Sequence, residues 1–245
     1  MTQIKLSENI NFPIERAPHI LIAGTTGSGK SVCMNLIINQ LVTNQPRALC
    51  IFIDIKRVEL SRYKNIKQCY KYCNDIESAR NALNIAYITM MNEYQYMERN
   101  GLTKTNKAPL FIFIDEYADL ILQDRNIEKT IASIARLGRA ANIHLIIATQ
   151  YPTREIISTQ IKINCTVRIC FRLNRTGSLV VLDKIGAEAL SGPGYAIMLY
   201  SNGQYYNFKS DMLSDSEINE FIAKNQKQKP KRKTFSEIIT NILTA

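Results

Sequence analysis

A glycine-rich segment near the N-terminus constrains this chain more than any other feature. Residues 24–31 read Gly-Thr-Thr-Gly-Ser-Gly-Lys-Ser and fit the pattern G-x-x-x-x-G-K-[S/T] without a mismatch. An apolar run typical of a strand, residues 19–23, comes before the segment, and residues 32–41 follow with the apolar spacing of a helix. In this context the glycines let successive backbone N–H groups point inward, and the positive end of the helix adds to the attraction for anions. We therefore predict a phosphate-binding loop.

The motif also assigns a role to each of its polar residues. Lys30 is expected to reach the β- and γ-phosphates of a nucleoside triphosphate, and the Ser31 hydroxyl is expected to ligate Mg²⁺. The residues that we expect around the phosphates are Gly24, Thr25, Thr26, Gly27, Ser28, Gly29, Lys30, Ser31 and Val32.

A second pattern lies about 85 residues further along the chain. The apolar run 110–114 has the length of a buried strand and ends in Asp115 and Glu116. We expect Asp115 to help hold the Mg²⁺, and Glu116 to polarise the attacking water as a general base. Asp54 ends a similar run, residues 48–53, and is either a ligand-binding residue at the carboxyl end of a strand or simply the end of that strand.

Two further candidates come from the segment 126–150. A predicted helix, residues 126–141, carries Arg136 and Arg139 in its last turn, where cations complement the helix dipole. The alternative is that one of these arginines reaches across a subunit interface to a neighbour's γ-phosphate. The strand predicted at 143–148 is followed by Thr149 and Gln150, a polar pair that could sense the γ-phosphate or hold the water.

Strands alternate with helices along the chain, which predicts an α/β fold with a mostly parallel sheet and helices on both faces.

The first 18 residues predict a lead-in with at most one edge strand. We expect a single domain at 1–223, and then a basic linker and a short amphipathic segment at 224–245. The other predicted elements are helices at 77–99, 154–163 and 214–223, strands at 167–171, 195–200 and 204–208, and a two-residue hairpin turn at Asn202–Gly203.

Composition indicates which class of partner the protein binds and in which cellular compartment it acts. The formal net charge of +10 over 245 residues favours a polyanionic partner. No apolar run approaches the ~20 residues that a membrane span needs, and no N-terminal signal pattern is visible, so we expect a cytoplasmic protein. The six cysteines fall mostly in apolar runs; Cys69 and Cys73 have no second Cys/His pair at zinc spacing, which favours reduced core thiols.

The order of these motifs resembles the motor domain of FtsK/SpoIIIE-type DNA translocases, from Pro18 to about Tyr200. The resemblance is carried by AGTTGSGKSV at 23–32, by Asp54-Ile55-Lys56, and by Asp115-Glu116-Tyr117-Ala118-Asp119-Leu120. It continues through Arg139-Ala140-Ala141-Asn142-Ile143-His144-Leu145, Ala148-Thr149-Gln150-Tyr151-Pro152, Leu182-Asp183 and Gly186-Ala187-Glu188.

The resemblance implies a RecA-like P-loop NTPase that hydrolyses ATP with Mg²⁺ and translocates double-stranded DNA through a homo-hexameric ring. It implies catalytic roles for Lys30, Glu116 and Gln150, and a residue acting in trans, for which Arg139 is the first candidate and Arg136 and Arg168 are the reserves. Since no membrane anchor or DNA-reading domain is seen in the sequence, we expect membrane-anchored or targeting partner proteins to recruit the motor, in the service of plasmid or mobile-element transfer.

At several positions this sequence departs from the residues that are usual in the family. These departures leave the predicted nucleotide-binding residues intact, and they bear on the pore and the subunit interface, and hence on the identity of the substrate. The usual Asp-Pro-Lys is Asp54-Ile55-Lys56, and the arginine after Thr-Gln is Tyr151. The Asp-Ser before the late Leu-Asp is Gly177-Ser178, and the Gly-Asp of the final strand is Gly194-Tyr195. Two other functions therefore remain open: a protein-secretion motor like the type VII ATPases, and an accessory DNA-binding subunit regulated by ATP.

Overall fold

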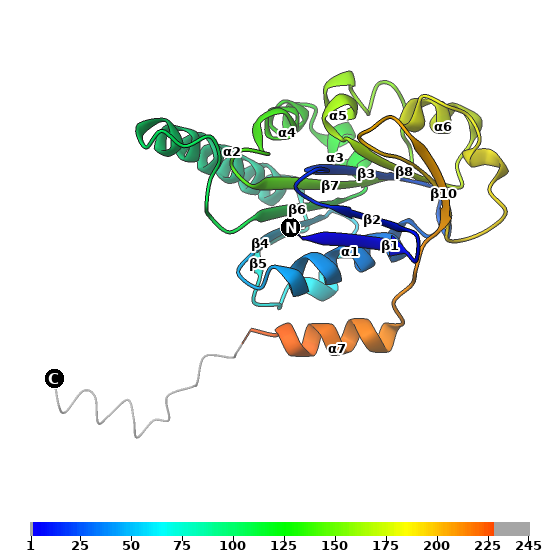
Figure 1. Ribbon diagram of the computed structural model, residues 1–245, viewed down its shortest axis with the longest axis horizontal. Helices are drawn as coiled ribbons and strands as arrows, with labels where there is room; N and C mark the ends of the chain where they lie inside the picture. The colour runs from blue at the N-terminus through cyan, green and yellow to red at the C-terminus, as the bar shows by residue number, and fades with distance from the viewer. Residues whose placement is uncertain (1, 228–245) are drawn as a thin grey trace.

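An eight-stranded sheet forms the centre of the molecule, and the computed structural model describes residues 2–227 (Figure 1). Its strand order is β10-β9-β8-β3-β7-β6-β4-β5. The strands from β8 to β5 are parallel to their neighbours, whereas β9 and β10 add an antiparallel extension beside β8. The bounds are β3 (His19–Ala23), β4 (Leu49–Asp54), β5 (Cys69–Cys73), β6 (Leu110–Asp115), β7 (Ile143–Thr149), β8 (Val167–Phe171), β9 (Tyr195–Leu199) and β10 (Tyr205–Lys209).

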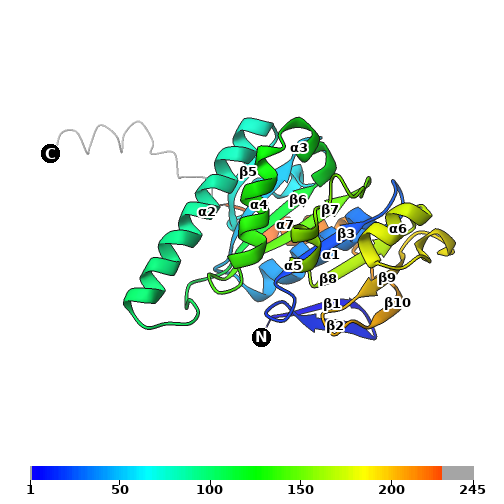
Figure 2. The same ribbon diagram turned by 90° about the horizontal axis from the view of Figure 1, so that it is seen from above.

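Helices cover both faces of this sheet, as Figure 1 shows and as the view from above confirms (Figure 2). One face carries α2 (Ile76–Arg99), α3 (Tyr117–Gln123), α4 (Asn126–Leu137), α5 (Thr159–Asn164) and α6 (Arg175–Leu182); the other carries α1 (Lys30–Asn44) and α7 (Asp215–Asn225). Successive strand residues alternate between the two cores: in β4, Ile51 and Ile53 join the first, and Cys50 and Phe52 the second. Because both faces are buried, the central strands are continuously apolar. The predicted α/β class is confirmed.

The N-terminal segment differs from the prediction of a lead-in with at most one edge strand. β1 (Gln3–Ser7) and β2 (Ile10–Pro13) pair with each other as a separate antiparallel hairpin and do not join the main sheet. Their inward residues Ile4, Leu6 and Phe12 pack in the same core as α1. The alternation of apolar and polar residues that creates this hairpin is visible in the sequence, but the strands are short and β2 ends in Pro13, which favoured a lead-in with at most one edge strand.

Other elements were missed or misplaced. β5 and α3 were not predicted, because five residues rich in tyrosine and cysteine and seven residues after an acid pair carry little periodicity. The helix predicted at 126–141 ends at Leu137, the helix predicted at 154–163 begins at Thr159, and two short 3₁₀ helices, η1 (Ser61–Tyr63) and η2 (Ala187–Ala189), were not foreseen. The β9–β10 turn uses three residues, 201–203, since the Tyr200 N–H donates to the Gln204 carbonyl.

At the C-terminal end, the helix predicted from residue 214 is observed as α7, and it begins with a capping box. The Ser214 side chain accepts from the Glu217 N–H, and the Glu217 carboxylate accepts from the Ser214 N–H. The helix continues to Asn225, so the boundary proposed at 223 falls inside it. Most of the predicted basic linker and the final amphipathic segment lie outside the described residues. Among the helices within 2–227, none combines the length and the apolar character that crossing a bilayer requires.

Gly138 provides a test of this packing, because it ends α4 where the chain turns into β7. A Cβ placed on Gly138 would lie 2.6 Å from the Ile143 carbonyl oxygen and 3.2 Å from His19 Cε1. We expect Gly138→Ala to destabilise the domain by about 1–3 kcal/mol, the cost of forcing an extra methyl group into a packed site. Urea unfolding measures this change. Gly192→Ala is the control, since nothing lies within 4 Å of a Cβ there; equal midpoints for the two variants would contradict the packing argument.

Candidate nucleotide-binding site

The carboxyl ends of three adjacent parallel strands bring the predicted site residues together. β3 lies beside β7, and β7 lies beside β6. The glycine-rich loop leaves β3 after Ala23, which pairs with Thr149 at the end of β7; Asp115 ends β6. In open α/β sheets this edge is where ligands bind. The topology therefore unites segments that are more than 120 residues apart in the chain.

Two backbone hydrogen bonds hold the start of the glycine-rich loop to the sheet. The Gly24 N–H donates to the Thr149 carbonyl (3.3 Å), and the Thr25 N–H donates to the Arg172 carbonyl (3.0 Å). The N–H groups of Gly27, Gly29 and Lys30 donate to no backbone carbonyl among the described residues. Unpartnered donors at the first turn of α1 form an anion-binding site, and the helix dipole adds to it.

Gly29 has to be glycine for two reasons. Its φ is 112°, a left-handed conformation that side chains rarely adopt. A Cβ there would also lie 3.0 Å from the backbone nitrogen of Gly194, which itself donates to the Ser28 carbonyl at 2.9 Å. The loop before β9 thus closes tightly over the glycine-rich loop.

The loop borders a cavity of about 520 Å³. Most of the predicted phosphate-binding residues line it: Thr25, Thr26, Gly27, Gly29, Lys30, Ser31 and Val32. Ser28 lines a smaller neighbouring pocket instead. Gly24 lies behind the loop, where a Cβ would be 2.5 Å from Ser28 Oγ, so its role is close packing.

Six lining residues were not predicted, because they come from the far end of the chain or from the loop after β4. Only the antiparallel extension of the sheet brings most of them beside β3, and no local motif marks them. They are Glu59, Pro193, Gly194, Lys209, Ser210 and Met212.

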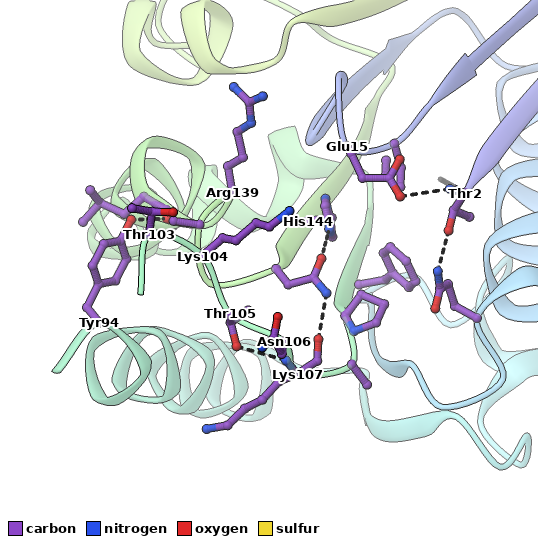
Figure 3. A pocket seen from close by; sticks show the side chains of 18 of the residues that line it. Thr2, Glu15, Tyr94, Thr103, Lys104, Thr105, Asn106, Lys107, Arg139 and His144 are labelled. Carbon is purple, nitrogen blue, oxygen red and sulfur yellow. Dashed lines mark hydrogen bonds between the residues drawn. The ribbon is translucent and has the colours of Figure 1, made fainter. Parts of the chain in front are cut away.

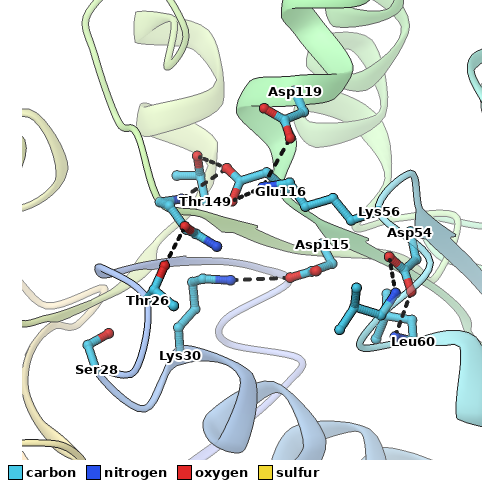
Figure 4. Close-up of polar contacts among 12 residues, drawn as sticks. Thr26, Ser28, Lys30, Asp54, Lys56, Leu60, Asp115, Glu116, Asp119 and Thr149 are labelled. Atoms are coloured by element: carbon cyan, nitrogen blue, oxygen red, sulfur yellow. Dashed lines mark hydrogen bonds and ion pairs between the residues drawn. The ribbon is translucent and has the colours of Figure 1, made fainter.

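Lys30 and Asp115 form a buried ion pair at the base of this cavity (Figure 4). The Lys30 Nζ lies 3.2 Å from Asp115 Oδ1, and the two side chains are 5% and 8% exposed. Ser31, the next residue on α1, lines the cavity. A hydroxyl and a carboxylate are hard oxygen donors of the kind that Mg²⁺ prefers alongside phosphate oxygens and water, so Ser31 and Asp115 fit the predicted metal role.

Glu116 is buried beside Asp115, and three elements hold its carboxylate (Figure 4). Its Oε1 accepts from Thr149 Oγ1 (3.2 Å) and from the Gln150 N–H (3.0 Å). Its Oε2 lies 3.6 Å from Lys56 Nζ. The Gln150 side chain in turn accepts from the Thr26 hydroxyl in the glycine-rich loop (2.9 Å). The predicted Glu116, Gln150 and Lys30 therefore lie around one site, and a continuous polar chain links them to the loop.

Asp54 has a local structural task. Its carboxylate is fully buried and accepts from the N–H groups of Val58 (3.3 Å) and Leu60 (2.9 Å). These bonds shape the turn after β4, where Arg57 has a φ of 62°. The sequence left two roles open for Asp54: ligand binding, or simply ending a strand. This geometry favours the structural role, in which Asp54 ends β4 and shapes the turn that follows it.

Arg139 lies at the opposite end of the sheet from the nucleotide cavity. It precedes β7, whereas Gln150 follows it, and seven strand residues span about 20 Å. Arg139 and Arg136 are exposed and line a second cavity of about 720 Å³ with Lys104, Lys107 and Glu15 (Figure 3).

The other arginine reserve and the two histidines have internal partners. Arg168 pairs with Asp183 (2.9 Å). His19 Nδ1 accepts from the Leu145 N–H, and His144 contacts the Pro18 carbonyl. Burial, followed by the neighbouring His144, lowers the pKa of His19 to about 3, and burial lowers the pKa of His144 to about 4. Both imidazoles are therefore neutral structural groups at physiological pH.

The cysteines behave as core residues. All six are free and buried, and burial raises the pKa of Cys73 to about 11, with smaller effects from its neighbours. No group of three or more His, Cys, Asp or Glu residues positioned for a metal ion occurs in the described part of the chain. Cys69 and Cys73 stand at the two ends of β5 and are buried in different cores, one on each face of the sheet.

Comparisons with known proteins agree with this geometry. Residues 3–108 and 96–154 match the model of the FtsK/SpoIIIE family. The DNA translocase FtsK of Leptospira interrogans is 34% identical over 243 residues, covering 89% of this chain and 25% of that protein. The DNA translocase SftA of Bacillus subtilis is 33% identical over 244 residues, covering 91% and 26%. The chain thus spans about a quarter of the length of these curated relatives.

Solved structures share the fold. The pCW3 conjugation coupling protein TcpA, in its monomer form with ATPγS, superposes with a TM-score of 0.81 at 25% identity, covering 92% of this chain and 71% of that one. The cytoplasmic domain of the type VII secretion ATPase EccC from Thermomonospora curvata gives a TM-score of 0.74 at 18% identity, covering 94% and 32%. At that identity, the second likeness concerns the fold alone.

The fold and the glycine-rich site define a RecA-like P-loop nucleotide-binding domain of the ATPase class. More specifically, the family match spans most of the chain, and the chain belongs to the FtsK/SpoIIIE family. The resemblance noted from the sequence is therefore confirmed.

The geometry of Glu116 leads to a test of its predicted role as general base. We expect Glu116→Gln to keep nucleotide affinity, because the amide preserves shape, and to lower kcat for ATP hydrolysis by about 10²–10⁴-fold. Fluorescent-nucleotide titration and a phosphate-release assay measure the two quantities. The control is Glu220→Gln on α7, whose carboxylate pairs with Lys224 on the surface. Hydrolysis at the wild-type rate by Glu116→Gln would remove Glu116 from the chemistry.

Proposed function

We propose that this domain is an ATP-driven motor that translocates double-stranded DNA as one subunit of a homo-hexameric ring, in the cytoplasm and recruited to the membrane by partner proteins. The relatives named DNA translocase match nine-tenths of the chain and supply the substrate class. The net charge of +10 suits a polyanion. The observation that carries the proposal is the placement of Lys30, Asp115, Glu116 and Gln150 around one phosphate-binding loop.

In this proposal, the loop amides and Lys30 bind the phosphates of ATP. Ser31 and Asp115 would hold Mg²⁺, which supplies charge neutralisation for the phosphoryl oxygens when bound. Glu116 accepts a proton from the attacking water, and Gln150 orients that water or contacts the γ-phosphate. Because Gln150 bonds both Thr26 and Glu116, a change at the loop is transmitted to the base through one residue.

The position of Arg139 supports assembly into a ring. Its side chain cannot reach the nucleotide of its own subunit, since about 20 Å of strand β7 separates the two ends of the sheet. An exposed arginine beside a large basic cavity is suited to meet the γ-phosphate of a neighbouring subunit. Such a trans arginine is worth about 10³–10⁵ in turnover.

A basic surface next to the loop is suited to contact DNA. The segment after β7 that contains α5 and α6 exposes four basic side chains, Arg154, Arg172, Arg175 and Lys184, and Arg172 lines the small pocket beside the glycine-rich loop. The Arg172 carbonyl accepts from both the Thr25 N–H and the Thr25 hydroxyl. Contact of this surface with a phosphate backbone would therefore be coupled directly to the nucleotide site.

The proposal predicts DNA-stimulated hydrolysis. ATP turnover should rise with linear duplex DNA more than with a single strand of equal length. The apparent DNA affinity should fall linearly on a log–log plot between about 50 and 200 mM salt as phosphate contacts release counterions. Turnover unaffected by duplex DNA, together with salt-insensitive or absent binding, would favour a secretion motor. DNA-dependent function that persists in Glu116→Gln, although ATP is bound and its hydrolysis is lost, would favour an accessory subunit regulated by ATP.

Arg139→Ala tests the ring. We expect it to bind ATP normally and to lose at least about 10³-fold in kcat. Mixing Arg139→Ala subunits with Glu116→Gln subunits should restore part of the activity. At some interfaces of a mixed ring, the intact Arg139 of a Glu116→Gln subunit then faces the intact Glu116 of an Arg139→Ala subunit. A mixture as inactive as either variant alone, although the subunits exchange, would exclude action in trans. Lys129→Ala, an exposed position on α4, is the control.

A further inference from the structure

Lys56 lies next to the buried carboxylate of Glu116, although no motif assigned it a role. It comes two residues after the end of β4, and its Nζ lies 3.6 Å from Glu116 Oε2 and 3.1 Å from Asp119 Oδ2. The side chain of Glu116 is 1% exposed and that of Lys56 is 39% exposed. Figure 4 shows the lysine extending from the β4 loop toward the two acids at the start of α3.

The two oxygens of Glu116 have different surroundings. Oε1 is fixed by Thr149 Oγ1 and the Gln150 N–H. Oε2 is buried and accepts no hydrogen bond from any described residue, since the contact with Lys56 is an ion pair just beyond hydrogen-bond length. Oε2 is therefore the oxygen left to accept a proton, and Lys56 is the cation beside it.

The backbone at Glu116 supports a functional reason for this arrangement. Its φ of 58° and ψ of 65° lie in the left-handed region, which is unfavourable for a residue with a long side chain. Such strain is retained where the surroundings fix a residue for a purpose. Here the strained residue starts α3 and directs the carboxylate toward the end of β7.

We propose that Lys56 is a positioning residue for the water-activating carboxylate: it fixes Oε2 of Glu116, and Asp119 fixes Lys56. This inference rests on the proposed function, because it requires that Glu116 acts on water. Asp119 gives the lysine a second anchor on the first turn of α3, so the amine stays in place beside Oε2.

Charge supports the assignment to Lys56 over other cations. Lys30 is bound to Asp115, and the Arg57 guanidinium donates to the Asn74 carbonyl. Partial burial lowers the pKa of Lys56, but the hydrogen bond that its amine donates to Asp119 and the charges of Glu116 and Asp119 outweigh this effect and raise the pKa overall. The amine is thus protonated at physiological pH, and it is the cation that faces the buried carboxylate of Glu116.

The first test compares Lys56→Met, Lys56→Arg and the control Lys224→Met, whose lysine pairs with Glu220 on the surface of α7. We expect Lys56→Met to lower kcat at least about tenfold, because small misplacements of a reacting group are costly, while the Kd for a fluorescent ATP analogue stays unchanged. Lys56→Arg should recover most of the loss, and Lys224→Met should match the wild type. An unchanged or increased kcat, or an equal loss of nucleotide affinity, would overturn the inference.

A double-mutant cycle separates positioning from an independent role. In the Glu116→Gln background, Lys56→Met should have no further effect on the single-turnover rate, since residues that act through one another are not additive. A further tenfold loss would show that Lys56 acts by itself and would overturn the inference. Asp119→Asn, which leaves the lysine itself in place, should give a smaller loss of kcat than Lys56→Met.

The outcomes also separate this inference from the proposed function. A wild-type domain that hydrolyses ATP, with a Lys56→Met variant of equal kcat, refutes only the role of Lys56. A wild-type domain that hydrolyses no ATP with or without DNA refutes the proposed function, and the inference fails with it. Circular dichroism of each variant checks folding, and Lys56→Arg and Asp119→Asn keep the test valid if Lys56→Met does not fold.

Discussion

The nucleotide site depends on backbone N–H groups that have no backbone partner among the described residues. The start of the loop after β3 is tied to the carbonyls of Thr149, the last residue of β7, and Arg172, the residue after β8; further along, the N–H groups of Gly27, Gly29 and Lys30 donate to no backbone carbonyl in the part of the chain that the structure describes. The Lys30 side chain lines the same cavity and is paired with Asp115. Free N–H donors, a lysine amine and the N-terminus of α1 together favour an anion such as a phosphate group.

Strand β7 runs between the nucleotide cavity at one end of the sheet and the basic cavity, lined by Arg139, at the other. Thr149 and Gln150 leave its carboxyl end beside the phosphate loop, and Arg139 precedes its amino end beside the basic cavity. A rigid strand transmits displacement with little loss, because both of its faces are buried in packed cores. In the ring that we propose, this geometry would let a subunit contact its own nucleotide with Gln150 and present Arg139 to the nucleotide of a neighbour.

Asp54 and Asp115 each end an apolar strand, β4 and β6, yet their carboxylates have different partners. Asp54 and Asp115 are register partners in the parallel pairing of β4 with β6. The chain after β4 folds back, so that Asp54 accepts from two N–H groups of its own loop. The chain after β6 enters α3 at once, which leaves Asp115 facing Lys30. The direction of the following chain, rather than the residue type, decides which carboxylate is available for a ligand.

The sequence by itself determined the glycine-rich loop between a strand and a helix, the acid pair at the end of β6, the central strands and the α/β class, because these depend on local patterns: glycines that allow positive φ and apolar runs buried on both faces. Only the tertiary structure decided that β1 and β2 form a separate hairpin, that residues 193–212 complete the cavity, and that Lys56 meets Glu116. These features join segments distant in the chain, and their pairing depends on strand order, which no local pattern encodes.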